Sequence, residues 1–166
     1  MINRENIFYW LTGAGVVWLF ARSRKPSTVE SVFNITGNLL AQLENFSAHP
    51  YWDISRYSWG YGTAAPGATG TISEPQARAD MLEHVRKDYQ YLKPMITIDL
   101  DPFQWAALLS FSYNLGPGNA DNLIQNINSE NWEAFRDQFK LYINADGIPR
   151  DYLRDRREIE LNYFFH

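Results

Sequence analysis

The chain has 166 residues, which is enough for one compact domain with a hydrophobic core but too few for two domains and a linker. Its net charge is −4, and residues 1–26 carry four basic side chains against a single acid, so the rest of the chain is acidic. A nucleic-acid-binding domain needs a basic face, which excludes nucleic acid as the expected partner. The chain has no Cys, and its three His show no metal-ligand spacing. We therefore expect no thiol chemistry, no metal and no cofactor.

The first distinct segment, residues 6–21, contains no charged residue. As a helix it would span about 24 Å, slightly less than the hydrocarbon core of a bilayer. Aromatic residues lie near both ends and basic residues follow, as is typical of membrane interfaces. We predict a single-pass transmembrane anchor within residues 1–26, followed by one domain at 27–166. A cleaved signal peptide and a buried core helix are the alternatives that this composition leaves open.

Capping signals and hydrophobic spacing predict the first helix of the domain. Ser27 and Glu30 form a capping box, and apolar residues then recur at helical spacing as far as about Glu44. Gly and Pro punctuate residues 45–72, where we expect a small sheet or hairpin. The segment YSWGYGT, residues 57–63, is predicted to form one strand.

The next two helices have clear signals at both ends. Ser73 with Gln76 forms a second capping box, and Lys93-Pro94 interrupts the helix that begins there. Asp101-Pro102 starts a strongly apolar helix, which Gly116-Pro117-Gly118 terminates. A helix this apolar is expected at the centre of the core.

Three shorter helices complete the predicted domain. One covers about 121–127, the next is opened by Ser129, and the last is capped by Asp151 after a turn at Asp146-Gly147. The fold class is therefore α+β, mostly helical with a small β-subdomain early in the domain.

Two carboxylic acids at the predicted start of the sheet could hydrolyse a glycosidic bond, which needs an acid and a second carboxylate. Glu44 ends an apolar helix, where partial burial favours the neutral acid. Asp53 lies nine residues later in a loop, where a more solvated carboxylate stays ionised. Such pairs are common in a chain with 19 acidic residues, so ordinary structural roles at a helix end and a turn remain the alternative.

The residues around this pair resemble the active-site stretch of phage-type lysozymes, the endolysins of glycoside hydrolase family 24. Glu44, Tyr51 and Asp53 match that stretch, and residues 58–62 replace its Thr-Ile-Gly-Tyr-Gly strand. Further motifs match in order, so that the resemblance covers about residues 30–165. They are a helix start at 72–77, a central helix with Gln104, Ala107, Leu108, Phe111, Tyr113, Asn114 and Gly116, a turn at Ile127-Asn128, and a closing motif with Leu153, Arg156, Arg157 and Glu160.

The resemblance implies that Glu44 is the general acid, that Asp53 orients and activates the attacking water, and that Ser58 helps to hold this water where the family has Thr. It also implies an inverting mechanism, in which the two carboxyl groups are far enough apart to admit a water. The chain departs from the family pattern at three places. The loop from Asp53 to Ser58 is one residue shorter, Asn45 replaces a Gly, and Thr63 replaces a His. The shortened loop over 54–58 is where reduced activity would originate.

The resemblance further implies three substrate-binding residues, Tyr51, Tyr61 and Asn114. For Asn114 a helix C-cap is the alternative, because it lies near the end of the apolar helix. For Arg156 and Arg157 we favour an ion pair with Glu158 or Glu160 of the same helix over a contact with substrate carboxylates.

The implied activity is that of a muramidase, which hydrolyses the β-1,4 bond between N-acetylmuramic acid and N-acetylglucosamine in bacterial peptidoglycan, either as a phage enters the cell or at host lysis. One alternative is a membrane-anchored virion structural protein with a lysozyme fold and reduced or no activity, in contact with virion or capsid proteins. The other is a lytic transglycosylase. That chemistry needs no base-activated water, so Asp53 and Ser58 argue against it.

The predicted anchor leaves two locations open. Arg22, Arg24 and Lys25 follow the apolar segment, and the positive-inside rule therefore favours a cytoplasmic domain. In a phage with an internal membrane, that side would face the capsid. A domain that reaches the cell wall from the host inner membrane needs the opposite orientation.

Overall fold

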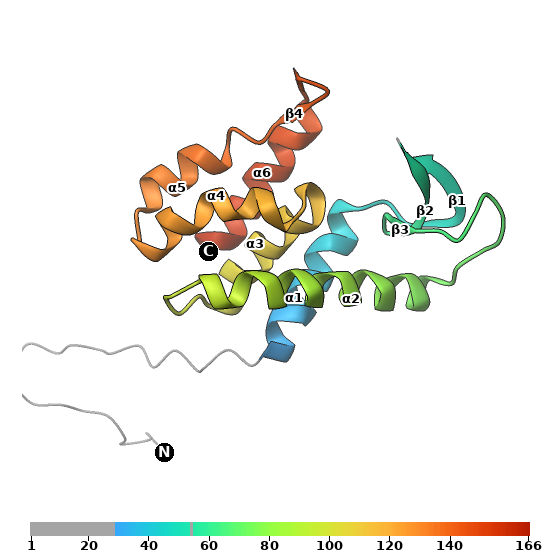
Figure 1. Cartoon of the computed structure of the whole chain (residues 1–166), viewed down its shortest axis with the longest axis horizontal. Helices are drawn as coiled ribbons and strands as arrows, with labels where there is room; N and C mark the ends of the chain where they lie inside the picture. Colours follow the sequence, from blue (N-terminus) through green and yellow to red (C-terminus); the bar gives the residue numbers. More distant parts are fainter. Residues whose placement is uncertain (1–28, 54) are drawn as a thin grey trace, which may run out of the picture.

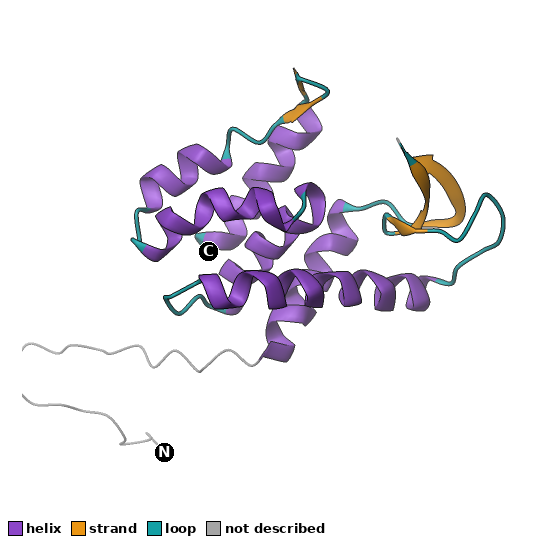
Figure 2. Ribbon diagram, viewed as in Figure 1, coloured by secondary structure: helices purple, strands orange, loops and turns teal. Residues whose placement is uncertain are grey.

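The computed structural model describes residues 29–53 and 55–166. The fold is α+β, as predicted: a set of helices with a small β-subdomain at one side (Figures 1 and 2). The elements are α1 (Val29–Leu43), β1 (Ser47–Asp53), β2 (Arg56–Gly60), β3 (Thr63–Ala64), α2 (Glu74–Leu92), the 3-10 helix η1 (Lys93–Met95), α3 (Pro102–Leu115), α4 (Pro117–Asn128), α5 (Trp132–Phe139), β4 (Asn144–Ala145), β5 (Ile148–Pro149) and α6 (Asp151–Phe164).

Helix α3 lies at the centre of the helical part, packed against α1, α2, α4 and α6. Its side chains from Trp105 to Ser112 are all buried, which agrees with its apolar sequence. Phenylalanines of α3, α5 and α6 pack together in the core: the ring centroids of Phe111 and Phe139 are 4.7 Å apart, and those of Phe135 and Phe164 are 4.3 Å apart. The last helix therefore closes the core around the middle one.

The β-subdomain is an antiparallel sheet in the order β1-β2-β3. The prediction that residues 57–63 form one strand is wrong. They form most of β2, a turn and the start of β3. The chain reverses because Gly60 and Gly62 have positive φ angles and the Gly62 N–H donates to the Trp59 carbonyl at 3.0 Å. At Gly60 a Cβ atom would lie 2.7 Å from the Ala77 Cβ, so β2 packs directly on α2.

Two helix starts agree with the predicted caps. The Ser73 hydroxyl accepts from the Gln76 N–H, but the Gln76 side chain donates to Asp80, so only half of that capping box forms. Asp101 and Gln104 form a complete box at the start of α3, which ends before Gly116. The helix predicted at 121–127 is longer than expected, because α4 already begins at Pro117.

Two other predicted caps are wrong. The N-cap of α5 is Asn131, whose side chain accepts from the Ala134 N–H, and not Ser129. The N-cap of α6 is Arg150, and Asp151 instead lies in the first helical turn, where it pairs with Arg154. The predicted turn at 146–147 is present, between the short strands β4 and β5.

The predicted anchor at 6–21 and the predicted cap at Ser27 lie outside the described residues. Among the helices that the structure describes, none is long and apolar enough to cross a membrane.

Candidate active site

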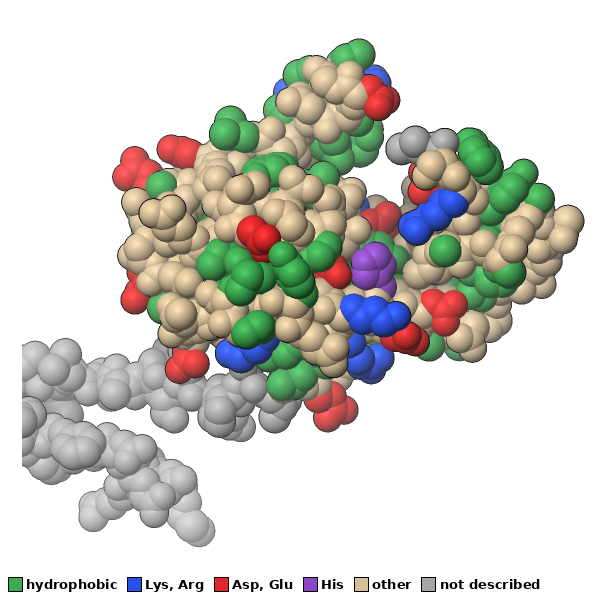
Figure 3. Space-filling view, viewed as in Figure 1, with side chains coloured by type: hydrophobic (Ala, Val, Ile, Leu, Met, Phe, Trp, Pro, Cys, Tyr) green, Lys and Arg blue, Asp and Glu red, His purple; other side chains and the backbone are tan. Residues whose placement is uncertain are grey.

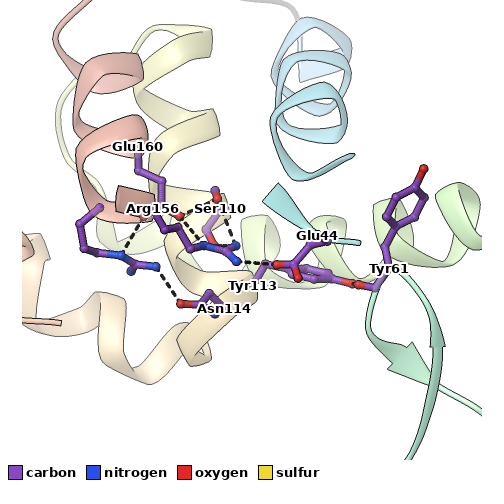
Figure 4. A network of polar contacts seen from close by, with 8 residues as sticks. Glu44, Tyr61, Ser110, Tyr113, Asn114, Arg156 and Glu160 are labelled. Carbon is purple, nitrogen blue, oxygen red and sulfur yellow. Dashed lines mark hydrogen bonds and ion pairs between the residues drawn. The ribbon is translucent and has the colours of Figure 1, made fainter. Parts of the chain in front are cut away.

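Glu44 directly follows α1, and its N–H donates to the Leu40 carbonyl at 2.8 Å. Its side chain is 24% exposed, which agrees with the half-buried position expected of the acid. Its Oε1 accepts a hydrogen bond from Arg156 Nη1 at 2.6 Å (Figure 4). The acid at the end of the first helix is therefore held by a residue of the last helix.

Arg156 is in turn held by two further groups, Glu160 and the Ser110 carbonyl (Figure 4). Its Nε donates to Glu160 Oε1 at 3.1 Å, and its Nη2 donates to the Ser110 carbonyl at 3.3 Å. The Ser110 hydroxyl donates to the same Glu160 oxygen at 2.6 Å. Burial raises the pKa of Glu160, while Arg157, Arg156 and the Ser110 hydroxyl act in the opposite direction. All three nitrogen atoms of the guanidinium that contacts Glu44 therefore have a hydrogen-bond partner.

Arg157 orients the predicted substrate residue Asn114. Its Nη2 donates to Asn114 Oδ1 at 2.7 Å, and its guanidinium lies over the Phe111 ring at 4.8 Å. Burial lowers the pKa of Arg157 to about 10, while the Glu160 charge opposes this shift. A guanidinium only donates, so the Asn114 amide oxygen must face it and the NH2 group points elsewhere. Gly116, and not Asn114, is the C-cap of α3. A substrate contact through the Asn114 NH2 group stays a prediction.

The side chains of Asp53 and Ser58 meet diagonally across the β1-β2 hairpin. The Ser58 hydroxyl donates to Asp53 Oδ2 at 3.4 Å, and the Ser58 residue is fully buried. The hydroxyl therefore positions the Asp53 carboxylate, despite the shortened loop between them. A direct bond from Ser58 to the attacking water stays a prediction.

Tyr51 connects the two halves of the site. It is exposed, and its partner across the hairpin is Ser58. Burial raises the pKa of Tyr51, and the charges of Asp53 and Glu44 both add to this rise. The charges of Glu44 and Asp53 both act on the Tyr51 hydroxyl, so Tyr51 lies near the predicted acid and the predicted base. That position is consistent with a substrate contact, which stays a prediction.

Tyr61 and Tyr113 link the sheet to α3. The Tyr113 hydroxyl donates to the Tyr61 carbonyl at 2.7 Å (Figure 4), and the Tyr61 hydroxyl donates to Glu74 Oε1 at 2.8 Å. Burial raises the pKa of Tyr113, and the nearby Glu44 charge adds to this rise. Tyr61 is only 4% exposed, so little of its side chain can reach a substrate. A substrate contact by Tyr61 stays a prediction.

The contact between Arg156 and Glu44 is the feature of the site that sequence reasoning missed. The predicted ion pairs of Arg156 and Arg157 with Glu160 are present, whereas Glu158 pairs with Lys140 at 3.2 Å. Helical spacing identifies partners on the same helix but gives no sign of a contact across 112 residues. Among the described residues, no group of three His, Cys, Asp or Glu could hold a metal ion.

The fold and the site together define a lysozyme-like domain. The profile of the phage lysozyme family matches residues 41–160, and the chain belongs to this family. The SAR-endolysin of Escherichia phage Mu is 27% identical over 135 residues, which cover 76% of this chain and 77% of that protein. These findings support a glycosidase-type enzyme that degrades peptidoglycan.

Two solved structures have the same fold. The muramidase domain of SpmX from Asticaccaulis excentricus superimposes with a TM-score of 0.72 at 17% identity, over 86% of this chain and 99% of that one. The endolysin from Escherichia coli O157:H7 phage FAHEc1 superimposes with a TM-score of 0.69 at 20% identity, over 86% of this chain and 94% of that one.

Proposed function

We propose that this chain is a muramidase, which hydrolyses the β-1,4 bond between N-acetylmuramic acid and N-acetylglucosamine in peptidoglycan. The observation that carries the proposal is the half-buried Glu44 carboxyl, which Arg156 holds by a hydrogen bond of 2.6 Å. The charges of Glu44 and Asp53 both act on the Tyr51 hydroxyl, so Tyr51 lies near both carboxyl groups. This arrangement supplies the two carboxyl groups that glycoside hydrolysis requires.

In this mechanism Glu44 donates its proton to the glycosidic oxygen as the bond to the anomeric carbon breaks. A water attacks that carbon from the opposite face, and Asp53 accepts the water's proton. The configuration of the carbon is inverted. Arg156 keeps the Glu44 carboxyl in place, and Ser58 keeps Asp53 in place.

The test uses the full-length chain and purified peptidoglycan. The Glu44→Gln variant keeps the shape of the side chain and removes the proton donor, so the rate falls about 10²-fold or more while the fold is retained. Glu133→Gln is the matched control, because Glu133 is exposed on α5. A Glu44→Gln protein with normal activity contradicts the assignment of the acid.

The products separate hydrolysis from the alternative reaction. A hydrolase gives reducing ends that contain one added water, whereas a lytic transglycosylase gives 1,6-anhydro ends that lack it. Mass spectrometry of the fragments distinguishes the two. We expect hydrated ends, because a lytic transglycosylase has no need of Asp53 and Ser58.

We also propose that residues 6–21 anchor the chain in a membrane. Their uncharged sequence and the similarity to a protein named SAR-endolysin support an anchor, and the second of these favours action at host lysis with the domain outside the inner membrane. Protease added to spheroplasts that express the full chain then digests the domain. A protected domain instead supports the cytoplasmic orientation and a role in the virion.

A further inference from the structure

A pocket of about 430 Å³ lies between the β-subdomain and α2. Arg56, Thr63 and Ala64 line it from the sheet, and Asp80, Glu83, His84 and Lys87 line it from the helix. Figure 3 shows a hollow between the β-subdomain and the helices, where acidic, basic and histidine side chains gather.

The pocket adjoins the catalytic cleft. Arg56 is the partner of Asp53 in the β1-β2 pairing. On the α2 side, the His84 ring lies 4.8 Å from the Tyr113 ring, and the Tyr113 hydroxyl lies close enough to Glu44 to sense its charge. A polymer bound at Glu44 and Asp53 can therefore place a substituent in the pocket.

The acidic side chains of the pocket already have partners. Glu83 pairs with Lys87 at 2.9 Å, and Asp80 accepts from the Gln76 amide at 2.7 Å. His84 lies 3.7 Å from the buried Asp88, outside the pocket lining. Arg56, by contrast, makes no ion pair or side-chain hydrogen bond with any residue that the structure describes. The pocket thus offers one free guanidinium, whose paired N–H donors suit a carboxylate.

We propose that this pocket binds a carboxylate of the peptide stem attached to N-acetylmuramic acid, with Arg56 as the residue that recognises it. The inference rests on the proposed function, which brings peptidoglycan into the adjoining cleft. The lactyl group of the sugar is consumed in the amide bond to the stem, and the acetamido groups are neutral. The free carboxylates of stem-bearing strands therefore belong to the stem.

The test compares two soluble peptidoglycan substrates that differ only in charge. In both, the stem amines are acetylated, and in one of them the stem carboxylates are also converted to neutral amides. The full-length chain is assayed for kcat/KM on each, together with Arg56→Gln, Arg56→Lys and the control Lys140→Gln. Lys140 is exposed and pairs with Glu158, so its loss changes the net charge by the same amount away from the pocket.

We expect the unchanged protein to prefer the carboxylate substrate, and Arg56→Gln to lower this preference about tenfold, mainly through KM. Arg56→Lys should keep part of the preference, and Lys140→Gln should keep all of it. High salt should reduce the preference, because the pocket is open to solvent.

Two outcomes overturn the proposal: an unchanged protein without preference, or an Arg56→Gln protein that is slowed equally on both substrates. The second outcome would mean that Arg56 maintains the structure of the β1-β2 hairpin and does not recognise the carboxylate. If neither substrate is cleaved, the proposed function fails separately. Sedimentation of the chain with insoluble charged and amidated peptidoglycan then tests the pocket, and equal binding of the two rejects it.

Discussion

Arg156 makes contact with Glu44, Glu160 and the Ser110 carbonyl through three different nitrogen atoms. A Lys at this position carries the same charge on a single nitrogen and cannot reproduce the three directions. Arg and Lys are therefore not equivalent at position 156, because the orientation of the Glu44 carboxyl depends on the planar arrangement of the guanidinium N–H donors.

We therefore expect Arg156→Lys to lower kcat by roughly 10- to 100-fold, with a much smaller change in KM. The physical reason is the loss of one or two charge-assisted hydrogen bonds that orient Glu44 and satisfy Glu160. Steady-state kinetics measures the effect. Arg154→Lys is the control, since Arg154 is exposed on the same helix. An Arg156→Lys protein with unchanged kcat shows that Glu44 is oriented without the guanidinium.

Two variants of Ser58 separate the effect of its hydroxyl on activity from the effect of its side-chain volume on stability. Its 3.4 Å hydrogen bond to Asp53 is long, so Ser58→Ala should cost about 1 kcal/mol, or roughly fivefold in kcat/KM. Ser58→Thr restores the residue of the family and should keep the activity. Because Ser58 is fully buried, the added methyl group should lower the free energy of unfolding by about 1 kcal/mol. Full activity in Ser58→Ala would remove this hydroxyl from the mechanism.

At the scale of elements, the predictions succeeded where the signal is local and strong. Asp101 and Gln104 lie three residues apart and satisfy each other's backbone groups, so the sequence identifies the start of α3. The strands β4 and β5 have two residues each, which is too short for any alternation to appear. The cap of α6 was misplaced because Asp151 has the composition of a cap but lies one position inside the helix.

Gly60 and Gly62 give a matched test of how β2 packs on α2. Both have positive φ angles, but only at Gly60 would a Cβ atom collide with Ala77. Gly62→Ala should cost about 1 kcal/mol from backbone strain alone. Gly60→Ala should cost about 1–3 kcal/mol more, because the clash adds to the strain. Denaturant unfolding measures both. Equal losses would mean that the hairpin moves away from α2 at little cost.

At the scale of the whole molecule, the cleft depends on contacts between distant parts of the chain. The sequence resemblance identified Glu44, Asp53 and Ser58 as candidates, but the orientation of Glu44 comes from α6 and that of Tyr113 comes from the sheet. Periodicity and caps describe single elements and carry no information about such partners. Predicting them requires the packing of α3 between α1 and α6.

Tyr113 joins the helical part to the β-subdomain, and its ionisation should weaken that connection. Its pKa is raised in the folded protein, so its contribution to stability is complete below the ordinary tyrosine pKa of about 10 and is lost as the pH rises above it. Tyr113→Phe lacks this contribution and its hydrogen bond, which costs about 1 kcal/mol.

The free energies of unfolding of the two proteins should therefore differ most at pH 8 and converge above about pH 10. Urea titrations across this range measure the difference. Arg157, whose pKa is lowered, gives an opposite slope in both proteins, and the comparison cancels it. A difference that stays constant to pH 11 would show that the Tyr113 hydroxyl is free to ionise in the folded state.

The 112 positions between Glu44 and Arg156 also have a consequence for biosynthesis. At ribosomal rates of about 5–20 residues per second, the acid leaves the ribosome roughly 6–22 s before its arginine. Until α6 emerges, Glu44 lacks its guanidinium, and the core lacks Phe164 beside Phe135. A nascent or prematurely ended chain therefore carries Glu44 and Asp53 without the contacts that α6 supplies, and we expect catalytic activity only once this final helix has emerged.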